Sequence, residues 1–166
     1  MTTKNLSQYD LSSVPAATGM RIGIVVSEWN FEITSELAKG AVTTLEKHRA
    51  ATENIMVRYV PGSFELPLGA QYFAEFENVD GVILLGCVIR GETSHFDYIC
   101  QGVTTGTTSL NLKYNKPFIF GVLTTSDFQQ ARDRAGGKYG NKGDEAAIAV
   151  IKMINLKHSF SKQDLP

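Results

Sequence analysis

Gly81-Val82-Ile83-Leu84-Leu85-Gly86-Cys87-Val88-Ile89 is the longest apolar run in this chain of 166 residues, and it ends at Arg90. A membrane-spanning helix needs about 20 apolar residues, so this run is too short to cross a bilayer. A short, uninterrupted apolar run is typical of a strand that is buried on both faces. We therefore expect residues 82–89 to form the central strand of a sheet.

Three further apolar runs resemble this one, and they lie at residues 22–26, 55–60 and 118–123. Amphipathic segments separate the four runs, and such an alternation of strands and helices indicates parallel βαβ units. The sequence therefore predicts an α/β protein: a flavodoxin-like three-layer α/β/α sandwich with a four-stranded parallel sheet and helices on both faces.

Apolar residues at helical spacing define the predicted helices between these strands. One helix is expected to begin near Ser63 as its N-cap, one to span residues 94–112, and a short one to begin at the capping-box pattern Ser126-Asp127-Phe128-Gln129 and to end at Gly136-Gly137. The residues expected to face the core are Ile33, Leu37, Ala41, Leu45, Leu66, Ala70, Phe73, Phe76, Ile99, Val103, Leu110, Ala146, Ala147, Val150, Ile151 and Ile154.

The length and composition fit a single domain over residues 21–157. Residues 1–20 are polar and are expected to form an N-terminal arm outside the core, and residues 158–166 a polar tail. Sixteen Lys and Arg against seventeen Asp and Glu leave a net charge of −1, which argues against a nucleic-acid binder. No apolar signal segment opens the chain, so we expect a cytoplasmic protein without a membrane anchor.

The two cysteines, Cys87 and Cys100, have neither the spacing nor the neighbouring histidines of a metal site. We therefore expect two small buried thiols and no metal.

Ligands of an open parallel sheet bind beyond the carboxyl ends of its strands. The unusual residues of this chain fall there. Trp29, the only tryptophan, follows the first strand and is either a core residue or a platform for a planar ring. Ser63 and Glu65 follow the second strand, where they serve either as helix caps or as hydrogen-bond partners of a polyhydroxy ligand.

The segment Gly91-Glu92-Thr93-Ser94-His95 follows the central strand and offers backbone N–H groups at a helix start, a potential anion site. His95 is the best placed of the three histidines for proton transfer near neutral pH, with a structural role as the alternative. A basic run around Gly136-Gly137 is either a solvated face or the source of a phosphate-binding arginine.

Five ordered motifs make the chain similar to the lumazine synthase family over residues 20–156. These motifs are Arg21-Ile22-Gly23-Ile24-Val25 with Trp29-Asn30, Val60-Pro61-Gly62-Ser63-Phe64-Glu65-Leu66-Pro67, Gly86-Cys87-Val88-Ile89-Arg90-Gly91-Glu92-Thr93-Ser94-His95-Phe96-Asp97-Tyr98, Phe120-Gly121-Val122-Leu123-Thr124-Thr125, and Arg134-Ala135-Gly136-Gly137-Lys138-Tyr139-Gly140-Asn141-Lys142-Gly143.

The resemblance implies a transferase of riboflavin biosynthesis. It condenses 5-amino-6-(D-ribitylamino)uracil with (S)-3,4-dihydroxy-2-butanone 4-phosphate to 6,7-dimethyl-8-ribityllumazine, releasing phosphate and water and using no cofactor. His95 matches the family's proton-transfer residue. Because both substrates are reactive, its loss is expected to slow the reaction rather than to abolish it.

The resemblance also assigns substrate contacts to matching positions. Trp29 is expected to stack on the pyrimidine, and the backbone of residues 87–89 to read the uracil edge. The remaining expected contacts are Ser63, Phe64 and Glu65 to the ribityl chain, Glu92 and Thr93 to the phosphate through main-chain N–H groups, Arg134 to the phosphate, and Phe120 and Lys142 to the walls of the site. The three residues whose backbone is expected to read the uracil edge are Cys87, Val88 and Ile89. The Glu92 carboxylate is expected to point away from the phosphate.

Family members form pentamers, and many assemble twelve pentamers into an icosahedral shell. The resemblance thus implies a homo-oligomer with sites between subunits, a shell of 60 copies, an arm that adds a strand to a neighbour's sheet, and a functional link to riboflavin synthase. Two rival interpretations are a flavin-binding flavodoxin-like protein and a shell protein without activity.

Overall fold

The computed structural model describes residue 5 and residues 7–161 of the chain. Its main sheet has four parallel strands in the order β2-β1-β3-β4, namely β2 (Ile55–Val60), β1 (Ile22–Ser27), β3 (Gly81–Ile89) and β4 (Phe118–Thr125). The apolar run 81–89 forms one of the two inner strands, and all of its first seven residues are buried. The predicted sheet is therefore confirmed.

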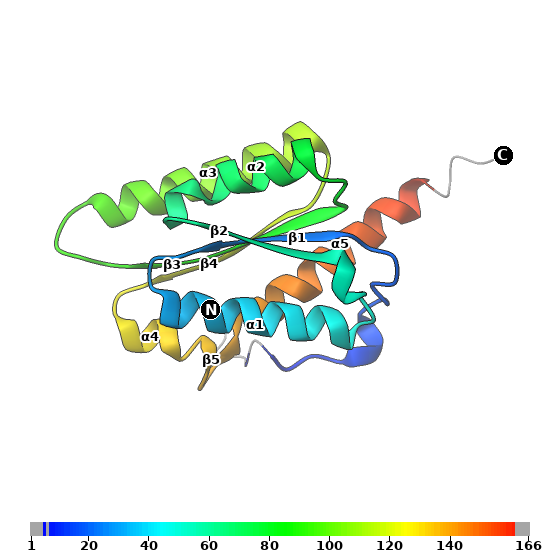
Figure 1. The fold of residues 1–166 in the computed structure, drawn as a ribbon. Coiled ribbons are helices and arrows are strands. Elements are labelled where there is room, and N and C mark those ends of the chain that lie inside the picture. Colours follow the sequence, from blue (N-terminus) through cyan, green and yellow to red (C-terminus); the bar gives the residue numbers. More distant parts are fainter. Residues whose placement is uncertain (1–4, 6, 162–166) are drawn as a thin grey trace.

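Helices cover both faces of this sheet, as Figure 1 shows. On one face lie α2 (Leu66–Phe76) and α3 (His95–Tyr114), and on the other lie α1 (Phe31–Lys47) and α5 (Lys142–Ser161). The short α4 (Phe128–Arg132) follows β4 on the side of α1. This is the predicted three-layer α/β/α sandwich. None of the described helices is both long and apolar enough to cross a membrane.

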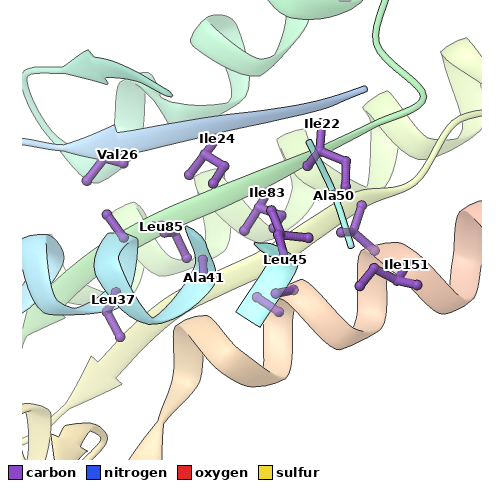
Figure 2. Packing of buried hydrophobic residues seen from close by; sticks show 14 of the residues in the cluster. Ile22, Ile24, Val26, Leu37, Ala41, Leu45, Ala50, Ile83, Leu85 and Ile151 are labelled. Carbon is purple, nitrogen blue, oxygen red and sulfur yellow. The ribbon is translucent and has the colours of Figure 1, made fainter. Parts of the chain in front are cut away.

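The larger core cluster joins the sheet to α1 and α5 (Figure 2). Alternate residues of β1 point into it, while Leu37, Ala41 and Leu45 form the matching stripe on α1. A second cluster lies beneath α2 and α3, where Leu66, Ala70 and Phe73 pack against the strands. The two clusters fix the sheet between its helices, so the strand ends that carry the candidate site rest on a rigid support.

Phe76 departs from the predicted core, because 76% of its side chain is exposed. It is the last residue of α2, and the buried stripe of this helix runs through Ala70 and Phe73. The ring of Phe76 lies beside Tyr72, also exposed, with 6.0 Å between the ring centroids. The expectation that Phe76 faces the core was wrong.

The N-terminal segment also differs from the expectation of an arm wholly outside the core. Val14, Ala17 and Met20 are buried in the larger core cluster, beyond a short 3₁₀ turn, η1 (Leu11–Ser13). The Ala17 N–H donates to the carbonyl oxygen of His48 at 2.7 Å, at the end of α1. These three apolar side chains, spaced three residues apart, hold the segment against the core of its own chain. Residues 1–4 lie outside the described part of the chain.

Between α4 and α5 the chain forms a small antiparallel hairpin that the sequence did not predict. Its strands are β5 (Ala135–Gly137) and β6 (Gly140–Asn141), and two of its glycines, Gly136 and Gly140, have positive φ angles of 101° and 80°. The preceding helix α4 ends at Arg132 rather than at Gly136-Gly137. Its N-cap is Asp127, whose side chain accepts from the N–H of Gln130 at 2.8 Å, one residue later than the predicted capping pattern.

Candidate active site

The loops that follow β1 and β2 are joined by backbone hydrogen bonds at the carboxyl edge of the sheet. The N–H of Glu28 donates to the carbonyl oxygen of Val60 at 2.8 Å, and the N–H of Trp29 donates to that of Pro61 at 3.1 Å. This ladder continues the β1–β2 pairing past the ends of both strands. It brings the motif around Trp29 and the motif around Glu65 into one place.

Trp29 lies outside the core, with 67% of its side chain exposed. One edge of its indole lies against Gly62, where an added Cβ would be 3.3 Å from Trp29 Cε3 and 3.0 Å from Glu65 Oε2. The exposed ring therefore lies beside the Glu65 carboxylate, separated by a residue without a side chain. This geometry excludes a core role for Trp29 and leaves the interpretation as a platform for a planar ring.

Glu65 closes a single 3₁₀ turn, η3 (Ser63–Glu65), that leads into α2. Its Oε2 accepts from the N–H of Gly62 at 3.0 Å, so this carboxylate caps the turn. Ser63 is not the N-cap that the sequence predicted. It is buried with its hydroxyl beneath the strand, since a Cβ at Gly86 would lie 2.6 Å from Ser63 Oγ. Phe64 is exposed and its ring lies over α3 at Gly102.

The end of β3 is held by a side chain that sequence reasoning did not assign to the site. Asn30, the N-cap of α1, has a φ of 58° and donates from Nδ2 to the carbonyl oxygen of Cys87 at 2.9 Å. Asparagine tolerates this left-handed conformation better than most residues, which is the signal that could have identified it. The contact ties the Trp29 loop to residues 87–89, and Val88 and Ile89 are half-buried beside it.

Cys87 itself is buried, and this burial raises the pKa of its thiol to about 12. A thiol that stays protonated at neutral pH is a poor nucleophile and a poor metal ligand. Cys100 is only half-buried, contrary to the expectation of two buried thiols. Among the residues that the structure describes, no group of three or more His, Cys, Asp or Glu side chains could hold a metal ion.

His95 is the first residue of α3 and is exposed at the end of the loop that follows β3. Glu92 and Thr93 are exposed in the same loop, and a Cβ built on Gly91 meets no atom within 4 Å. The backbone of this loop is thus open to an approaching ligand. A helix N-terminus and open N–H groups favour an anion at this place.

Two cations of the site prediction, Arg134 and Lys142, are brought together by the β5–β6 hairpin. The N–H of Lys142 donates to the carbonyl oxygen of Arg134 at 2.8 Å. The Arg134 guanidinium donates to the carbonyl of Gln130 at 3.1 Å and lies 4.9 Å from the Tyr139 ring centroid, so it has no carboxylate partner among the described residues. Lys142, by contrast, is paired with Glu145.

A cavity of about 410 Å³ lies beside this hairpin, between α1 and β5. Its lining includes Glu32, Glu36 and Arg132, and none of the predicted site residues. The cavity is therefore separate from the cluster around Trp29, Glu65 and His95.

Phe120 does not join that cluster within its own chain. It is the third residue of β4 and pairs with Leu84, five residues before the strand ends at Thr125. At about 3.3 Å per residue, this places it about 16 Å from the carboxyl end of β4. β4 is an edge strand of the sheet, and the half-buried Phe120 packs against the core cluster beneath α2 and α3.

Comparison with known proteins identifies the family to which the chain belongs. Residues 19–158 match the family described as 6,7-dimethyl-8-ribityllumazine synthase. The chain belongs to the lumazine synthase family. Proteins of that name from Parabacteroides distasonis and Porphyromonas gingivalis are 62% and 56% identical over 153 residues each, covering 92% of this chain and 96% and 95% of theirs.

A lumazine synthase from Phocaeicola vulgatus is 53% identical over 161 residues, which are 97% of this chain and 96% of the relative. The family, the transferase activity of riboflavin biosynthesis and the fold predicted from the sequence are thereby confirmed. Membership of the lumazine synthase family implies small-molecule substrates and an oligomeric assembly. The comparisons name no residue, so the roles of individual side chains are a matter of proposal.

Proposed function

We propose that this chain condenses 5-amino-6-(D-ribitylamino)uracil with (S)-3,4-dihydroxy-2-butanone 4-phosphate at the carboxyl edge of its sheet, in a site completed by a neighbouring subunit. The observation that carries this proposal is the exposed Trp29 ring, which lies beside the Glu65 carboxylate at the edge where His95 begins α3. The lumazine, inorganic phosphate and water are the products.

In this proposal Trp29 stacks on the pyrimidine, and the backbone of residues 87–89 hydrogen-bonds to the uracil edge. The Asn30 contact supports this assignment, because it fixes the end of β3 relative to the Trp29 loop. The Cys87 carbonyl already accepts one hydrogen bond from Asn30 and retains a second lone pair. The ribityl chain lies along Ser63, Phe64 and Glu65, where the free carboxylate oxygen of Glu65 accepts from a hydroxyl.

The phosphate of the second substrate binds at the open loop before α3, through main-chain N–H groups of Glu92 and Thr93. The exposure of this loop supports the assignment. We assign Arg134 to the same phosphate, since its guanidinium has no carboxylate partner in the described part of the chain, and Lys142 to the wall of the site. The Glu92 side chain points away from the bound anion.

His95 transfers protons in the successive steps. The 5-amino group attacks the ketone carbon, and loss of water from the adduct gives an imine. His95 protonates the departing hydroxyl and removes the proton that precedes phosphate elimination. Loss of phosphate leaves an enol, which tautomerises to a new ketone on the neighbouring carbon. The ribitylamino nitrogen attacks this new carbonyl, and loss of a second water completes the lumazine. Much of the acceleration comes from holding two reactive molecules together, and no cofactor or metal takes part.

The second subunit supplies Phe120. Its place on the edge strand β4, away from the carboxyl edge of its own sheet, supports a role in a neighbour's site. Large exposed apolar side chains on η3, α2 and α3 also favour an interface on this face: Phe64, Leu68, Tyr72, Phe76, Tyr98 and Leu112. We propose a pentamer that assembles into a cytoplasmic shell of 60 copies and supplies lumazine to riboflavin synthase. The proposed arm strand on a neighbour's sheet belongs to the same assembly.

The test is turnover of the two substrates by the assembled protein, followed by lumazine absorbance with phosphate release in parallel. We expect lumazine to form well above the spontaneous rate and in step with phosphate. His95→Ala should be slower than the wild type but still active. If the wild type and His95→Ala both showed only the spontaneous rate, the protein would be a shell protein without activity. If the wild type showed no turnover but bound flavin, it would be a flavodoxin-like carrier.

A further inference from the structure

Arg90 and Asp97 lie on opposite sides of the loop that carries His95. Arg90 follows β3, and Asp97 lies in the first turn of α3. Their side chains form a two-pronged ion pair, with Arg90 Nη2 donating to Asp97 Oδ1 at 2.7 Å and Nη1 donating to Oδ2 at 3.3 Å. We propose that this pair is a brace that positions His95 for proton transfer, an inference that rests on the proposed role of His95.

The loop needs such a brace because it has few contacts of its own. Residues 91–95 are exposed, and no hydrogen bond in the described part of the chain ties residues 91–93 to another element. The N–H of His95 makes only a 3.4 Å contact with Thr93 Oγ1. Outside these residues the backbone is fixed again, since the N–H of Arg90 donates to the carbonyl oxygen of Thr125 at 2.9 Å.

The Arg90 guanidinium spans this gap with a third contact. Its Cζ lies 4.1 Å from the centroid of the Phe96 ring, next to His95 in the chain. A planar guanidinium that stacks on a ring while it pairs with a carboxylate is held in one orientation. The side chain thus links the end of β3, Phe96 and Asp97 across the base of the His95 loop.

The same geometry argues against Arg90 as a phosphate ligand. Its charge is matched by Asp97, and a phosphate approaching the pair would face the Asp97 carboxylate. The guanidinium lowers the pKa of Asp97 below its ordinary value, so that this carboxylate stays ionised at neutral pH. Arg134, which has no such partner among the described residues, is the better phosphate ligand.

Both side chains are about half exposed, and an exposed ion pair contributes little to global stability. Its contribution to rate is expected to be larger, because a displacement of about 1 Å of a catalytic group costs up to about 100-fold. Asp97→Asn should therefore lower kcat about 10-fold and leave the melting temperature and the KM for the ribitylaminouracil nearly unchanged. Asp97→Glu, which keeps the charge, should retain most of the activity.

The deciding experiment is a double-mutant cycle with His95. If Asp97 acts through His95, Asp97→Asn slows the wild type but has no further effect in the His95→Ala background. Lys39→Gln, which removes the exposed Lys39–Glu36 pair on α1, is the matched control and should leave kcat unchanged. The doubly exchanged variant, with Arg90→Asp and Asp97→Arg, should recover part of the lost rate.

An equal loss of rate in both backgrounds, or no loss in the wild-type background, would overturn the brace. A wild-type protein that fails to accelerate the reaction would overturn the proposed function, and the role of the brace with it. Normal turnover and a slow His95→Ala variant, together with an unaffected Asp97→Asn variant, would overturn the brace alone.

Discussion

The hydroxyl of Ser27 lies at the last position of β1, directly beneath the candidate site. Ser27 is fully buried, and its Oγ has no hydrogen-bond partner among the described residues. A buried polar group without a partner costs about 1–3 kcal/mol. Its neighbour Thr34 is also buried, but Thr34 Oγ1 donates to the Ser27 carbonyl oxygen at 2.7 Å. The two hydroxyls therefore make opposite contributions to stability.

Ser27→Ala is accordingly expected to raise the free energy of unfolding by about 1 kcal/mol. Thr34→Val, which keeps the side-chain volume, should lower it by about the same amount. Urea unfolding followed by circular dichroism measures both values. A loss of stability in Ser27→Ala would show that this hydroxyl has a partner in solution.

The exposed ring of Trp29 is the proposed platform for the pyrimidine. Because its ring is exposed and stacking contributes about 1–3 kcal/mol, Trp29→Ala should raise the KM for the ribitylaminouracil about 10-fold or more without loss of stability. Trp29→Phe should retain most of the affinity, since it keeps an aromatic face. Steady-state kinetics with the pyrimidine varied gives the comparison, and an unchanged KM in Trp29→Ala would exclude stacking.

The contact between α1 and α5 depends on Gly143. A Cβ at this position would collide with the carbonyl oxygen of Leu37 and would lie 2.9 Å from the Asn141 Oδ1. Gly143→Ala should therefore lower the free energy of unfolding by about 1–3 kcal/mol, as other overpacked substitutions do. Thermal unfolding measures the loss. Gly91→Ala, which meets no atom within 4 Å, is the matched control for stability.

The N-terminal segment is attached to the end of α1 through a histidine. His48 is buried, and its Nε2 lies 2.9 Å from the Tyr9 hydroxyl. Burial, together with the neighbouring Lys47, lowers the pKa of His48 below its ordinary value of 6.5. The unfolded chain therefore binds a proton more readily than the folded chain, and stability falls as the pH drops below about 6.5.

Urea midpoints between pH 5 and pH 7.5 should show this loss in the wild type. In His48→Gln the pH dependence over that interval should be weaker, because glutamine does not titrate. Equal slopes in the two proteins would contradict the assignment to His48.

The sequence allowed the main elements to be predicted because each has an uninterrupted or strongly periodic apolar pattern. The hairpin β5–β6 has only three and two residues in its strands, too few for a period to appear. Phe76 was predicted to be buried because it is apolar and lies three residues after the buried Phe73. It is the last residue of α2, however, and the buried stripe of this helix ends at Phe73. Val14, Ala17 and Met20 were missed because Pro15 and Gly19 interrupt the segment, so that no strand or helix pattern appears there.

The candidate site could be predicted from the sequence only for the part that one chain forms by itself. The edge rule for parallel sheets brought Trp29, Glu65 and His95 to one border, and the described structure places them there. Asn30 and the Arg90–Asp97 pair depend on side-chain geometry that spacing does not give. The place of Phe120 depends on a second copy, and no pattern within one chain specifies where that copy lies.

Subunit mixing tests this dependence on a second copy. His95→Ala and Phe120→Ala, each at least tenfold slower than the wild type, are unfolded together in equal amounts and refolded. If each site takes one group from each of two adjacent subunits, about one quarter of the sites regain both side chains. Activity should then recover to about one quarter of the wild-type value. Activity no higher than the average of the separate variants would place both residues in the same subunit.

Trp29 has one more consequence. As the only tryptophan of the chain, it is the source of nearly all the fluorescence excited near the red edge of protein absorption, and it stands in the open at the place where the pyrimidine is proposed to bind. An indole stacked on a conjugated heterocycle transfers its excitation to that ring instead of emitting light. The protein therefore carries its own optical reporter, whose quenching follows occupancy of the pocket in real time and without any label.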